Sequence, residues 1–245
     1  MSIDWHMTFD TQKMLMTGAN GLLGGEIKKL LPEALYTNKE DFDITNPQQM
    51  EGYLIGKDVG CILHAAAMTS PPKIDKNPAE TLQTNIIGTA NVALLCLKHG
   101  FKLVYMCTDY VFAGDRGNYK EEDPVFPVNK YAWSKLGGEC TVRMIGKHLI
   151  IRTSFGENVF PYKKAFVDHW TSRQSVSVIA RKVVKAMQVG ISGTLHIGGN
   201  RRSVYEYAND LDPSKEIGKL SVRDVNFVVP ADTSLGCSKY QSLIK

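Results

Sequence analysis

Short apolar runs alternate along this chain with stretches in which apolar residues recur every three or four positions. The short runs predict buried strands at 13–16, 34–37, 59–64, 102–107 and 194–197. The stretches at helical spacing predict helices at 22–31, 47–54, 78–100 and 178–187, whereas 70–78 is expected to be a loop. Strands alternating with helices predict an α/β fold, with a parallel sheet covered on both faces by helices.

Glycines at i, i+3 and i+6 follow the first apolar run, and the first helical pattern begins immediately after them. Gly18 allows a tight turn, Gly21 allows backbone to approach a ligand, and Gly24 allows the helix to pack on the strand. Free N–H groups at the helix N-terminus attract phosphate. The turn therefore predicts a dinucleotide pyrophosphate site. Its residues assigned to cofactor contact are Gly18, Asn20, Gly21, Leu22, Leu23 and Gly24.

The residues after the second predicted strand bear on which dinucleotide binds. An acidic residue at this point favours a free ribose 2′-hydroxyl, whereas a basic residue accepts a 2′-phosphate. The chain reads Thr37-Asn38-Lys39, with no carboxylate before Glu40. Asn38 and Lys39 are therefore assigned to cofactor contact, and Lys39 favours NADP over NAD. An exposed loop lysine is the alternative interpretation.

The composition is typical of a soluble globular protein, with 43% hydrophobic and 22% charged residues among 245. The net charge of +4 is spread without a long basic run, so no nucleic-acid surface is expected. No apolar stretch has the length of a membrane span. The first dozen residues are mixed in character and are interpreted as a short extension, not a signal peptide. These features predict a cytoplasmic protein without membrane association.

The five cysteines are odd in number and none lies in C-x-x-C spacing. Most lie within apolar runs, which predicts reduced core thiols and neither disulfides nor zinc ligands. No cluster of His, Asp and Glu has the spacing of metal ligands, so no metal is expected.

Tyr131 and Lys135 lie four residues apart on a predicted helix, so their side chains share one face. A lysine ammonium beside a phenol stabilises the phenolate and brings its pKa from about 10 toward neutrality. Thr108 follows a core strand and supplies a hydroxyl that can orient a substrate oxygen. The three residues together predict hydride transfer to a carbonyl, with Tyr131 as proton donor. Tyr131 and Lys135 are also assigned to cofactor contact.

Several motifs in order resemble the extended short-chain dehydrogenase/reductase family. They are T-G-x-x-G-x-x-G at 17–24, three alanines after His64, T-D-Y-V-F at 108–112, and Y-x-x-x-K followed by G-E at 138–139. Over residues 13–155 the match is similar to the dTDP-4-dehydrorhamnose reductase branch. This resemblance implies a Rossmann-type domain and NAD(P)H-dependent reduction of a nucleotide-linked 4-keto-sugar.

The resemblance also assigns roles to residues that the pattern alone leaves ambiguous. It places Asp43 and Ile44 beside the adenine, although an Asp before a helix is usually a turn residue. It makes Asn85 a support of the catalytic lysine through water. His64 remains either a ligand contact or a structural residue. The alanines implied to line the cofactor are Ala65, Ala66 and Ala67.

Tyr110 helps to separate reaction types within the family. Sugar-nucleotide dehydratases of the family that this chain resembles have Thr-Asp-Glu at three consecutive positions. This chain has Thr108-Asp109-Tyr110 at those positions. Because the acidic pair assists water elimination, Tyr110 favours simple reduction. A nucleotide-sugar epimerase remains an alternative, since epimerisation needs only the tyrosine and a bound cofactor.

The second half of the chain resembles the family less. We expect a Rossmann domain over 13–155, with 177–198 returning to it, and a small lobe, shortened and substrate-binding, from 156–176 and 199–245. Pro230 to Leu235 resembles R-P-x-x-S-x-L without its arginine. Arg201 and Arg202 either meet a sugar-nucleotide diphosphate or belong to an exposed turn.

The shortened lobe motivates a second hypothesis, a non-catalytic NADP-binding regulator. The regulatory subunit of methionine adenosyltransferase resembles the same branch. A nucleotide sugar is the expected partner under the first hypothesis, and a larger protein under the second. A homodimer is left open.

Overall fold

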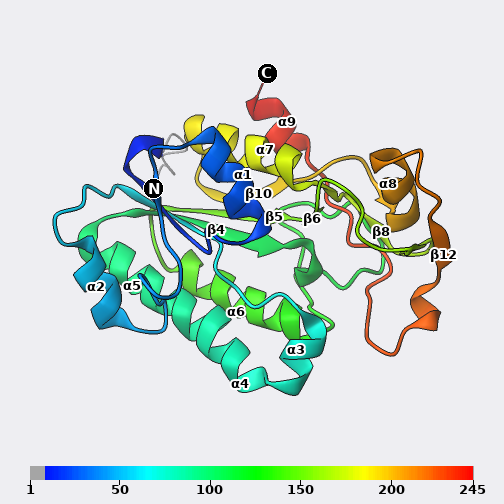
Figure 1. The fold of residues 1–245 in the computed structure, drawn as a ribbon, viewed down its shortest axis with the longest axis horizontal. Coiled ribbons are helices and arrows are strands. Elements are labelled where there is room, and N and C mark those ends of the chain that lie inside the picture. Colours follow the sequence, from blue (N-terminus) through cyan, green and yellow to red (C-terminus); the bar gives the residue numbers. More distant parts are fainter. Residues whose placement is uncertain (1–8, 245) are drawn as a thin grey trace.

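The computed structural model describes residues 9–244. Residues 1–8, most of the segment interpreted as a short extension, lie outside the described residues. Within the described part, the main sheet has six strands that are all parallel (Figure 1). In spatial order they are β10 (Gly193–Ile197), β5 (His148–Thr153), β4 (Lys102–Thr108), β3 (Cys61–His64), β1 (Met14–Thr17) and β2 (Leu35–Tyr36).

Helices connect the strands along the chain. The α-helices are α1 (Leu22–Leu30), α2 (Pro47–Leu54), α3 (Pro71–Lys76), α4 (Pro78–Thr81), α5 (Thr89–His99), α6 (Lys130–Arg143), α7 (Val176–Gln188), α8 (Val204–Leu211) and α9 (Ser238–Leu243). A π-helical segment, η2, spans Leu82–Gly88. Single 3-10 turns occur at η1 (Thr11–Lys13), η3 (Asp109–Val111) and η4 (Val222–Asp224).

Alternate residues of each strand point to opposite faces of the sheet, and both faces are buried. Met14 and Met16 of β1 belong to a cluster that includes α1 and α7, whereas Leu15 belongs to a second cluster with α2, α5 and α6. Figure 1 shows α1 and α7 on one side of the sheet and α5 and α6 on the other. The doubly wound, Rossmann-type parallel sheet expected from the sequence is thus confirmed.

The strand order reverses between β1 and β3. From β1 the chain runs to β2 on one side, and then crosses to β3, β4 and β5 on the other. Loops that leave neighbouring strands in opposite directions open a crevice at the carboxyl ends of those strands. The glycine turn after β1 and the alanines after β3 therefore lie at the same edge of the sheet.

Two predicted elements differ from the structure. The stretch 70–78, expected to be a loop, contains α3, because proline is compatible with the first turn of a helix, where its missing N–H costs no hydrogen bond. The long helix expected over 78–100 is divided into α4, η2 and α5, and Asn85 lies inside the π-helical segment. π-Helical turns of this kind frequently mark functional sites.

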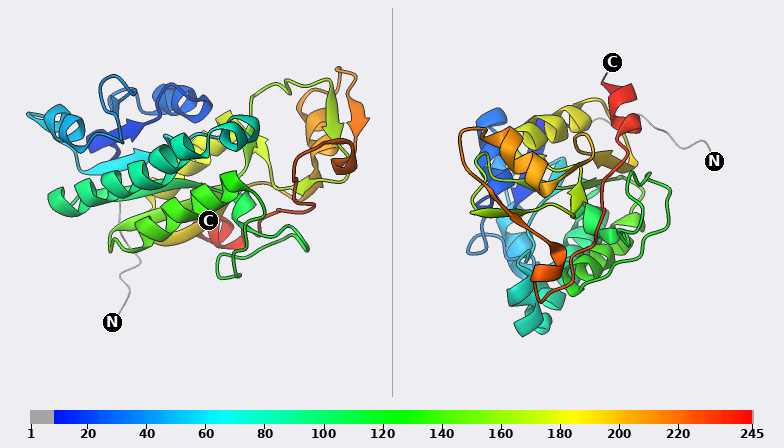
Figure 2. Two further views of the ribbon diagram at one scale, coloured as in Figure 1. Left: turned by 90° about the horizontal axis from the view of Figure 1, so that it is seen from below. Right: turned by 90° about the vertical axis from the view of Figure 1, so that its right-hand side faces the viewer.

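The small lobe has its own short strand pairs and its own buried cluster. The lobe pairs are β7 (Lys164–Phe166) with β12 (Gly218–Leu220) and β8 (Trp170–Thr171) with β11 (Arg202–Ser203). A further pair, β6 (Phe155–Gly156) with β9 (Gln174–Ser175), lies where the chain leaves and re-enters the main domain. Figures 1 and 2 both place the lobe at one end of the molecule, beyond β5 and β6.

The C-terminal helix departs from the expected division. Although 199–245 was assigned to the small lobe, α9 packs against β10, and Tyr240 is buried in the cluster that includes α1 and α7. The chain therefore returns to the main domain at its end, because the apolar face of α9 finds its partner there.

Other features of the described residues concern metals, thiols and membranes. Among residues 9–244, no group of three or more His, Cys, Asp or Glu side chains is arranged to hold a metal ion. All five cysteines are free thiols, and four of them are buried, Cys140 being the exposed one. Within the same range, no helix combines the length and apolar character that crossing a membrane requires.

Candidate functional site

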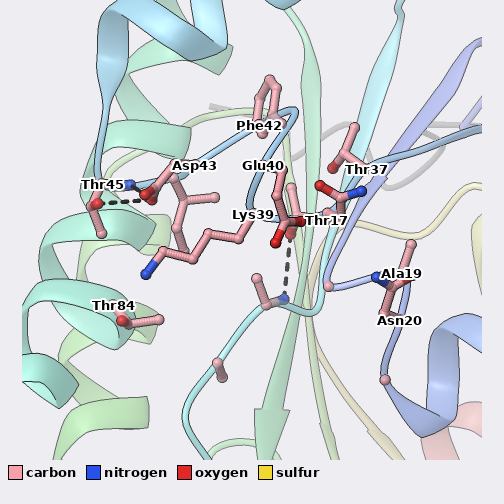
Figure 3. Close-up of a pocket in the computed structure, with 16 residues that line it drawn as sticks. Thr17, Ala19, Asn20, Thr37, Lys39, Glu40, Phe42, Asp43, Thr45 and Thr84 are labelled. Atoms are coloured by element: carbon pink, nitrogen blue, oxygen red, sulfur yellow. Dashed lines mark hydrogen bonds between the residues drawn. The ribbon is translucent and has the colours of Figure 1, made fainter.

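A cavity of about 360 Å³ lies over the glycine turn, between the ends of β1, β2 and β3 (Figure 3). Nine of the residues that the sequence assigns to cofactor contact line this cavity. They are Gly18, Asn20, Gly21, Asn38, Lys39, Asp43, Ile44, Ala66 and Ala67. The turns after three different strands therefore form one wall, as expected for the adenosine side of a dinucleotide site.

The glycines of this turn are required by close backbone contacts. Gly18 has φ +70°, and a Cβ there would lie 2.6 Å from the Ala66 nitrogen. A Cβ on Gly24 would lie 2.2 Å from the Ala19 oxygen. Gly21 is the N-cap of α1 and has no side chain to occupy the helix's first N–H groups, which stay available to an anion.

The part of this cavity that follows β2 carries both a cation and a carboxylate. Lys39 and Glu40 both line it, and Figure 3 shows the Lys39 side chain extended across the cavity toward Thr84. Asp43 lines the same cavity while its Oδ1 accepts hydrogen bonds from the backbone N–H and hydroxyl of Thr45, at 2.8 and 2.7 Å. Asp43 is thus a turn residue that also faces the cavity.

A second cavity of about 310 Å³ continues the first along the edge of the sheet. The two share Gly18, Gly21 and part of the alanine segment after β3. Its other residues include Leu22, Leu23, Ala65, Cys107, Tyr131 and Lys135. The continuous groove connects the predicted pyrophosphate turn with the predicted catalytic pair, which is the layout that an extended dinucleotide needs.

Tyr131 also lines a third cavity, of about 390 Å³, on the side toward the small lobe. Thr108 lies in its wall at the end of β4, and Asp109, Tyr110 and Arg173 face the same space. Thr108 and Tyr131 thus lie in the wall of one cavity. The structure therefore brings Thr108 and Tyr131 to the place where the groove opens into a separate chamber.

The protonation of the Tyr131–Lys135 pair differs from the expectation. Burial raises the pKa of Tyr131 above its ordinary value, and the neighbouring Thr108 hydroxyl opposes this only in part. Burial lowers the pKa of Lys135 to about 8, and its Nζ lies 4.2 Å from the centre of the Tyr105 ring. The pKa of the phenol is therefore raised and not brought toward neutrality as predicted, because burial disfavours the charged phenolate. Tyr131 is a protonated phenol at neutral pH, able to donate.

The buried Asp109 carboxylate holds Thr108 in place by a hydrogen bond. The carboxylate is 2% exposed and accepts hydrogen bonds from Thr233 at 2.7 Å and Thr108 at 3.2 Å. Burial raises its pKa, while the threonine hydroxyls and the charge of Arg173 work in the opposite direction. Because Thr233 lies in the C-terminal segment, Asp109 links the end of β4 to that segment.

Asn85 supports α6, the helix that carries Tyr131 and Lys135. Its amide exchanges two hydrogen bonds with the backbone of Met68, at 2.8 and 2.9 Å, and donates to Ser134 Oγ at 2.8 Å. Ser134 in turn donates to the carbonyl of Tyr131. Asn85 therefore fixes α6 between Tyr131 and Lys135. The role implied by the resemblance, acting on the lysine through water, stays a prediction.

His64 is a buried structural residue. Its Nδ1 lies 2.7 Å from the Thr17 hydroxyl and its Nε2 lies 3.0 Å from that of Thr89. Burial lowers its pKa to about 3, so the ring is neutral. Of the two interpretations left open by the sequence, the geometry favours the structural one.

The two arginines singled out in the sequence form ion pairs with aspartates, and a third arginine, Arg173, lines the third cavity. Arg201 forms an ion pair with Asp232 at 2.7 Å, and Arg202 pairs with Asp210 at 2.6 Å. Arg173 instead faces the third cavity and donates through Nε to Ser154 Oγ at 3.4 Å. No motif marks Arg173 in the sequence, because its position depends on how β8 and β9 return along the lobe.

A fourth cavity of about 570 Å³ lies in the small lobe and adjoins the third. The two share Tyr110, Tyr162 and Arg173. Its remaining wall is largely aromatic and aliphatic with two lysines, from Phe160, Lys163, Lys164, Ala165, Phe166, His169, Val204, Leu220, Val225 and Phe227. The lobe thus offers a wide, mostly apolar chamber with Lys163, Lys164 and Arg173 in its wall.

Comparison with known proteins gives consistent results. The family profile described as the RmlD substrate binding domain matches residues 12–232. A dTDP-4-dehydrorhamnose reductase of Aggregatibacter actinomycetemcomitans is 31% identical over 70% of this chain and 61% of its own length. Methionine adenosyltransferase 2 subunit beta of Rattus norvegicus is 24% identical over 98% of this chain and 85% of its own length.

A solved structure is similar over nearly the whole chain. The dTDP-4-dehydrorhamnose reductase of Bacillus anthracis, in complex with NADP, superposes with a TM-score of 0.83 at 27% identity. The superposition covers 94% of this chain and 90% of that one. By contrast, this chain spans less than two thirds of the length of the Aggregatibacter reductase.

Proposed function

The chain belongs to the family of the RmlD substrate binding domain, and we propose on this premise that it is an NADP-dependent oxidoreductase. The reaction is reduction of a nucleotide-linked 4-keto-sugar, as the names of its reductase relatives indicate. The observation that carries the proposal is the meeting of Thr108 and Tyr131 at the opening between the dinucleotide groove and a separate chamber.

The residues of the groove fit a dinucleotide. The glycine turn leaves a space that a Cβ at Gly18 would fill, and the first N–H groups of α1 are available there to bind an anion. Lys39 is placed to neutralise a ribose 2′-phosphate, which favours NADP. Lys135 is placed to hydrogen-bond the nicotinamide ribose. When bound, NADPH supplies the hydride.

The chain's own residues hold and protonate the carbonyl. Thr108 is held by the hydrogen bond that its hydroxyl donates to Asp109, and it bounds the position of the carbonyl oxygen beside Tyr131. Tyr131, a protonated phenol, donates its proton to that oxygen as negative charge develops there. The nearby ammonium of Lys135 stabilises the resulting phenolate. Asn85, through its hydrogen bond to Ser134, holds α6 in position beside the third cavity.

The remaining parts of the substrate have complementary surfaces in the lobe. We assign the sugar to the third cavity and the nucleotide to the fourth, where aromatic side chains can stack on a base. Arg173 lies at their junction, where the diphosphate would lie, and no carboxylate of residues 9–244 forms an ion pair with it. A guanidinium that lines a cavity and forms no direct ion pair is suited to bind an anionic ligand.

Arg173→Gln is expected to raise KM for the nucleotide sugar about tenfold to hundredfold with little change in kcat. A hydrogen bond to a charged group contributes about 1.5–3 kcal/mol, and this one is made to a part of the substrate that does not react. Steady-state kinetics measures the change. Arg181→Gln, an exposed arginine on α7, is the matched control. An unchanged KM in the Arg173 variant would exclude the diphosphate assignment.

A second function, the cofactor-binding regulator, is favoured by the match to methionine adenosyltransferase 2 subunit beta over 98% of the chain. We test the two by fluorescence titration with NADPH and NADH, followed by addition of dTDP-4-keto-6-deoxyhexose. Oxidation of bound NADPH supports the reductase. Binding without oxidation, together with co-purification of a larger protein, supports the regulator. Failure of both cofactors to bind would exclude both functions.

We also propose a homodimer. The exposed side of η2, α5 and α6 carries Ile87, Leu94, Trp133 and Met144, which are 44–83% exposed. Exposed large apolar side chains on adjacent helices are typical of an interface. Light scattering should give twice 27.2 kDa for the wild-type chain and half that mass for Leu94→Asp. A monomeric wild-type protein contradicts the proposal.

The buried thiols favour a reducing, cytoplasmic compartment.

A further inference from the structure

His169 lies in the small lobe just before β8 and is 2% exposed. Its Nδ1 lies 2.7 Å from the carbonyl oxygen of Pro230. A carbonyl only accepts hydrogen bonds, so Nδ1 must carry the ring proton. The ring meets Tyr110 and Phe166 edge-on, at 86° and 88°, which restricts its rotation. The backbone of the C-terminal segment therefore selects the tautomer of this histidine.

The other ring nitrogen is an acceptor. Burial lowers the pKa of His169 to about 4, and the charge of Arg173 acts in the same direction, so the ring is neutral at physiological pH. Its Nε2 then has a lone pair and no proton. The Tyr110 hydroxyl lies 3.3 Å away, and burial raises the pKa of that phenol to about 12. Tyr110 consequently donates its proton to His169.

Tyr110 occupies the junction of the third and fourth cavities, next to the reactive groups. Its ring centre lies 6.4 Å from that of Tyr131. The Tyr131 phenol is a donor toward a carbonyl oxygen, whereas Thr108 and Tyr110 have their hydroxyl protons committed to Asp109 and His169. The Tyr110 oxygen therefore presents only lone pairs to the chamber, so a donor, Tyr131, and an acceptor, Tyr110, lie in the same wall.

We propose that His169 is a positioning residue that makes Tyr110 a dedicated acceptor for a hydroxyl on the substrate. This inference rests on the proposed function and defines its substrate class: a keto-sugar with a free hydroxyl next to the carbonyl. A carbonyl cannot donate to Tyr110, so the pair also selects the orientation in which the keto oxygen faces Thr108 and Tyr131. A site built to bind a hydroxyl discriminates against an analogue that lacks it.

The tautomer is tested directly, without turnover, by ¹⁵N NMR of the histidine side chains in the full-length protein. His169 is assigned from the signal that disappears in His169→Gln. Protonated Nδ1 and unprotonated Nε2 are expected, with the Nε2 shift changed in Tyr110→Phe. A protonated Nε2 in the wild-type protein would overturn the proposal. This result does not depend on whether the chain is a reductase.

The specificity is tested by comparing kcat/KM for the keto-sugar and for its deoxy analogue at the carbon next to the carbonyl. The wild-type protein should prefer the hydroxylated substrate about tenfold to hundredfold. Tyr110→Phe and His169→Phe should each reduce the preference to less than about threefold. The double variant should add nothing to Tyr110→Phe, because both changes remove one interaction.

His169→Gln provides the conservative comparison, since its amide oxygen can still accept from Tyr110 and should restore part of the preference. Thermal melting and NADPH titration verify that each variant is folded. If the wild-type protein reduces both substrates and Tyr110→Phe keeps the full preference, the proposal is wrong while the reductase function stands. If it reduces neither, the reductase function fails and the NMR result alone decides the tautomer.

Discussion

Replacing Tyr131 with phenylalanine should reduce turnover of the keto-sugar about a thousandfold while NADPH still binds. Tyr131 lies in the wall between the dinucleotide groove and the third cavity, and its protonated phenol is the donor beside Thr108. General acid catalysis typically contributes a factor of about 10²–10⁴. The ring itself is retained, so the shape of the groove should not change. Single-turnover oxidation of NADPH measures the loss, and fluorescence titration measures cofactor affinity.

The control for this experiment is Tyr205→Phe, which removes a phenol from α8 in the small lobe, away from the dinucleotide groove. That variant should retain wild-type turnover. Turnover in Tyr131→Phe within a few-fold of the wild-type rate would contradict the assignment of the acid. Loss of NADPH binding in the same variant would instead show that Tyr131 acts mainly in forming the groove.

Arg152→Met should lower the free energy of unfolding by about 3–5 kcal/mol, the largest stability effect that we expect for a single side chain. Arg152 on β5 and Glu139 on α6 are each 1% exposed. The guanidinium donates to both carboxylate oxygens, at 3.0 and 2.6 Å. Removing Arg152 leaves the buried Glu139 carboxylate with Arg143 as its remaining ion-pair partner, and the Arg143 side chain is 47% exposed. Breaking a buried pair costs about this amount. Urea denaturation followed by circular dichroism measures the change.

A double variant, Arg152→Met with Glu139→Met, separates the loss of the pair from the loss of packing. Its destabilisation should be clearly smaller than the sum of the two single changes, because no buried charge is left alone. Additive losses would contradict the ion-pair explanation. Arg143, which also donates to Glu139 at 2.8 Å, is more exposed and should matter less when replaced.

The same pair predicts a dependence of stability on pH. Burial alone would raise the pKa of Glu139, but hydrogen bonds and charge from Arg152 and Arg143 outweigh it and hold the pKa below its ordinary value. A carboxylate with a depressed folded-state pKa contributes stability at pH values above its unfolded pKa, near 4.3. That contribution is lost as the pH falls through the folded value. Arg152→Met should flatten this acid-side dependence.

The buried pair also bears on catalysis. Glu139 lies one helical turn after Lys135, and Arg152 lies on the strand beside β4, which ends at Thr108. The pair therefore fixes the helix carrying Tyr131 and Lys135 against the strands that carry the rest of the site. This explains in physical terms the Gly-Glu pair that follows Y-x-x-x-K in the sequence.

Much of the cofactor half of the protein was determined by local sequence pattern. The alternation of strands and helices, the glycines from Gly18 to Gly24, and the four-residue spacing of Tyr131 and Lys135 all express geometry within a few residues. Periodicity and backbone conformation are properties of neighbours in the chain, so they can be read without tertiary contacts. The parallel sheet followed from that pattern and from the family resemblance, and Thr108 and Tyr131, predicted to act together, line one cavity.

Only the tertiary structure decided the substrate side and the protonation states. Arg173 rather than Arg201 faces the chamber because it directly precedes β9, which returns to pair with β6. The Tyr110–His169–Pro230 chain joins residues that are 59 and 61 positions apart. The raised pKa of Tyr131 depends on how completely neighbouring elements enclose it. Desolvation and long-range contacts arise only when distant segments pack together, and no local pattern of residues encodes them.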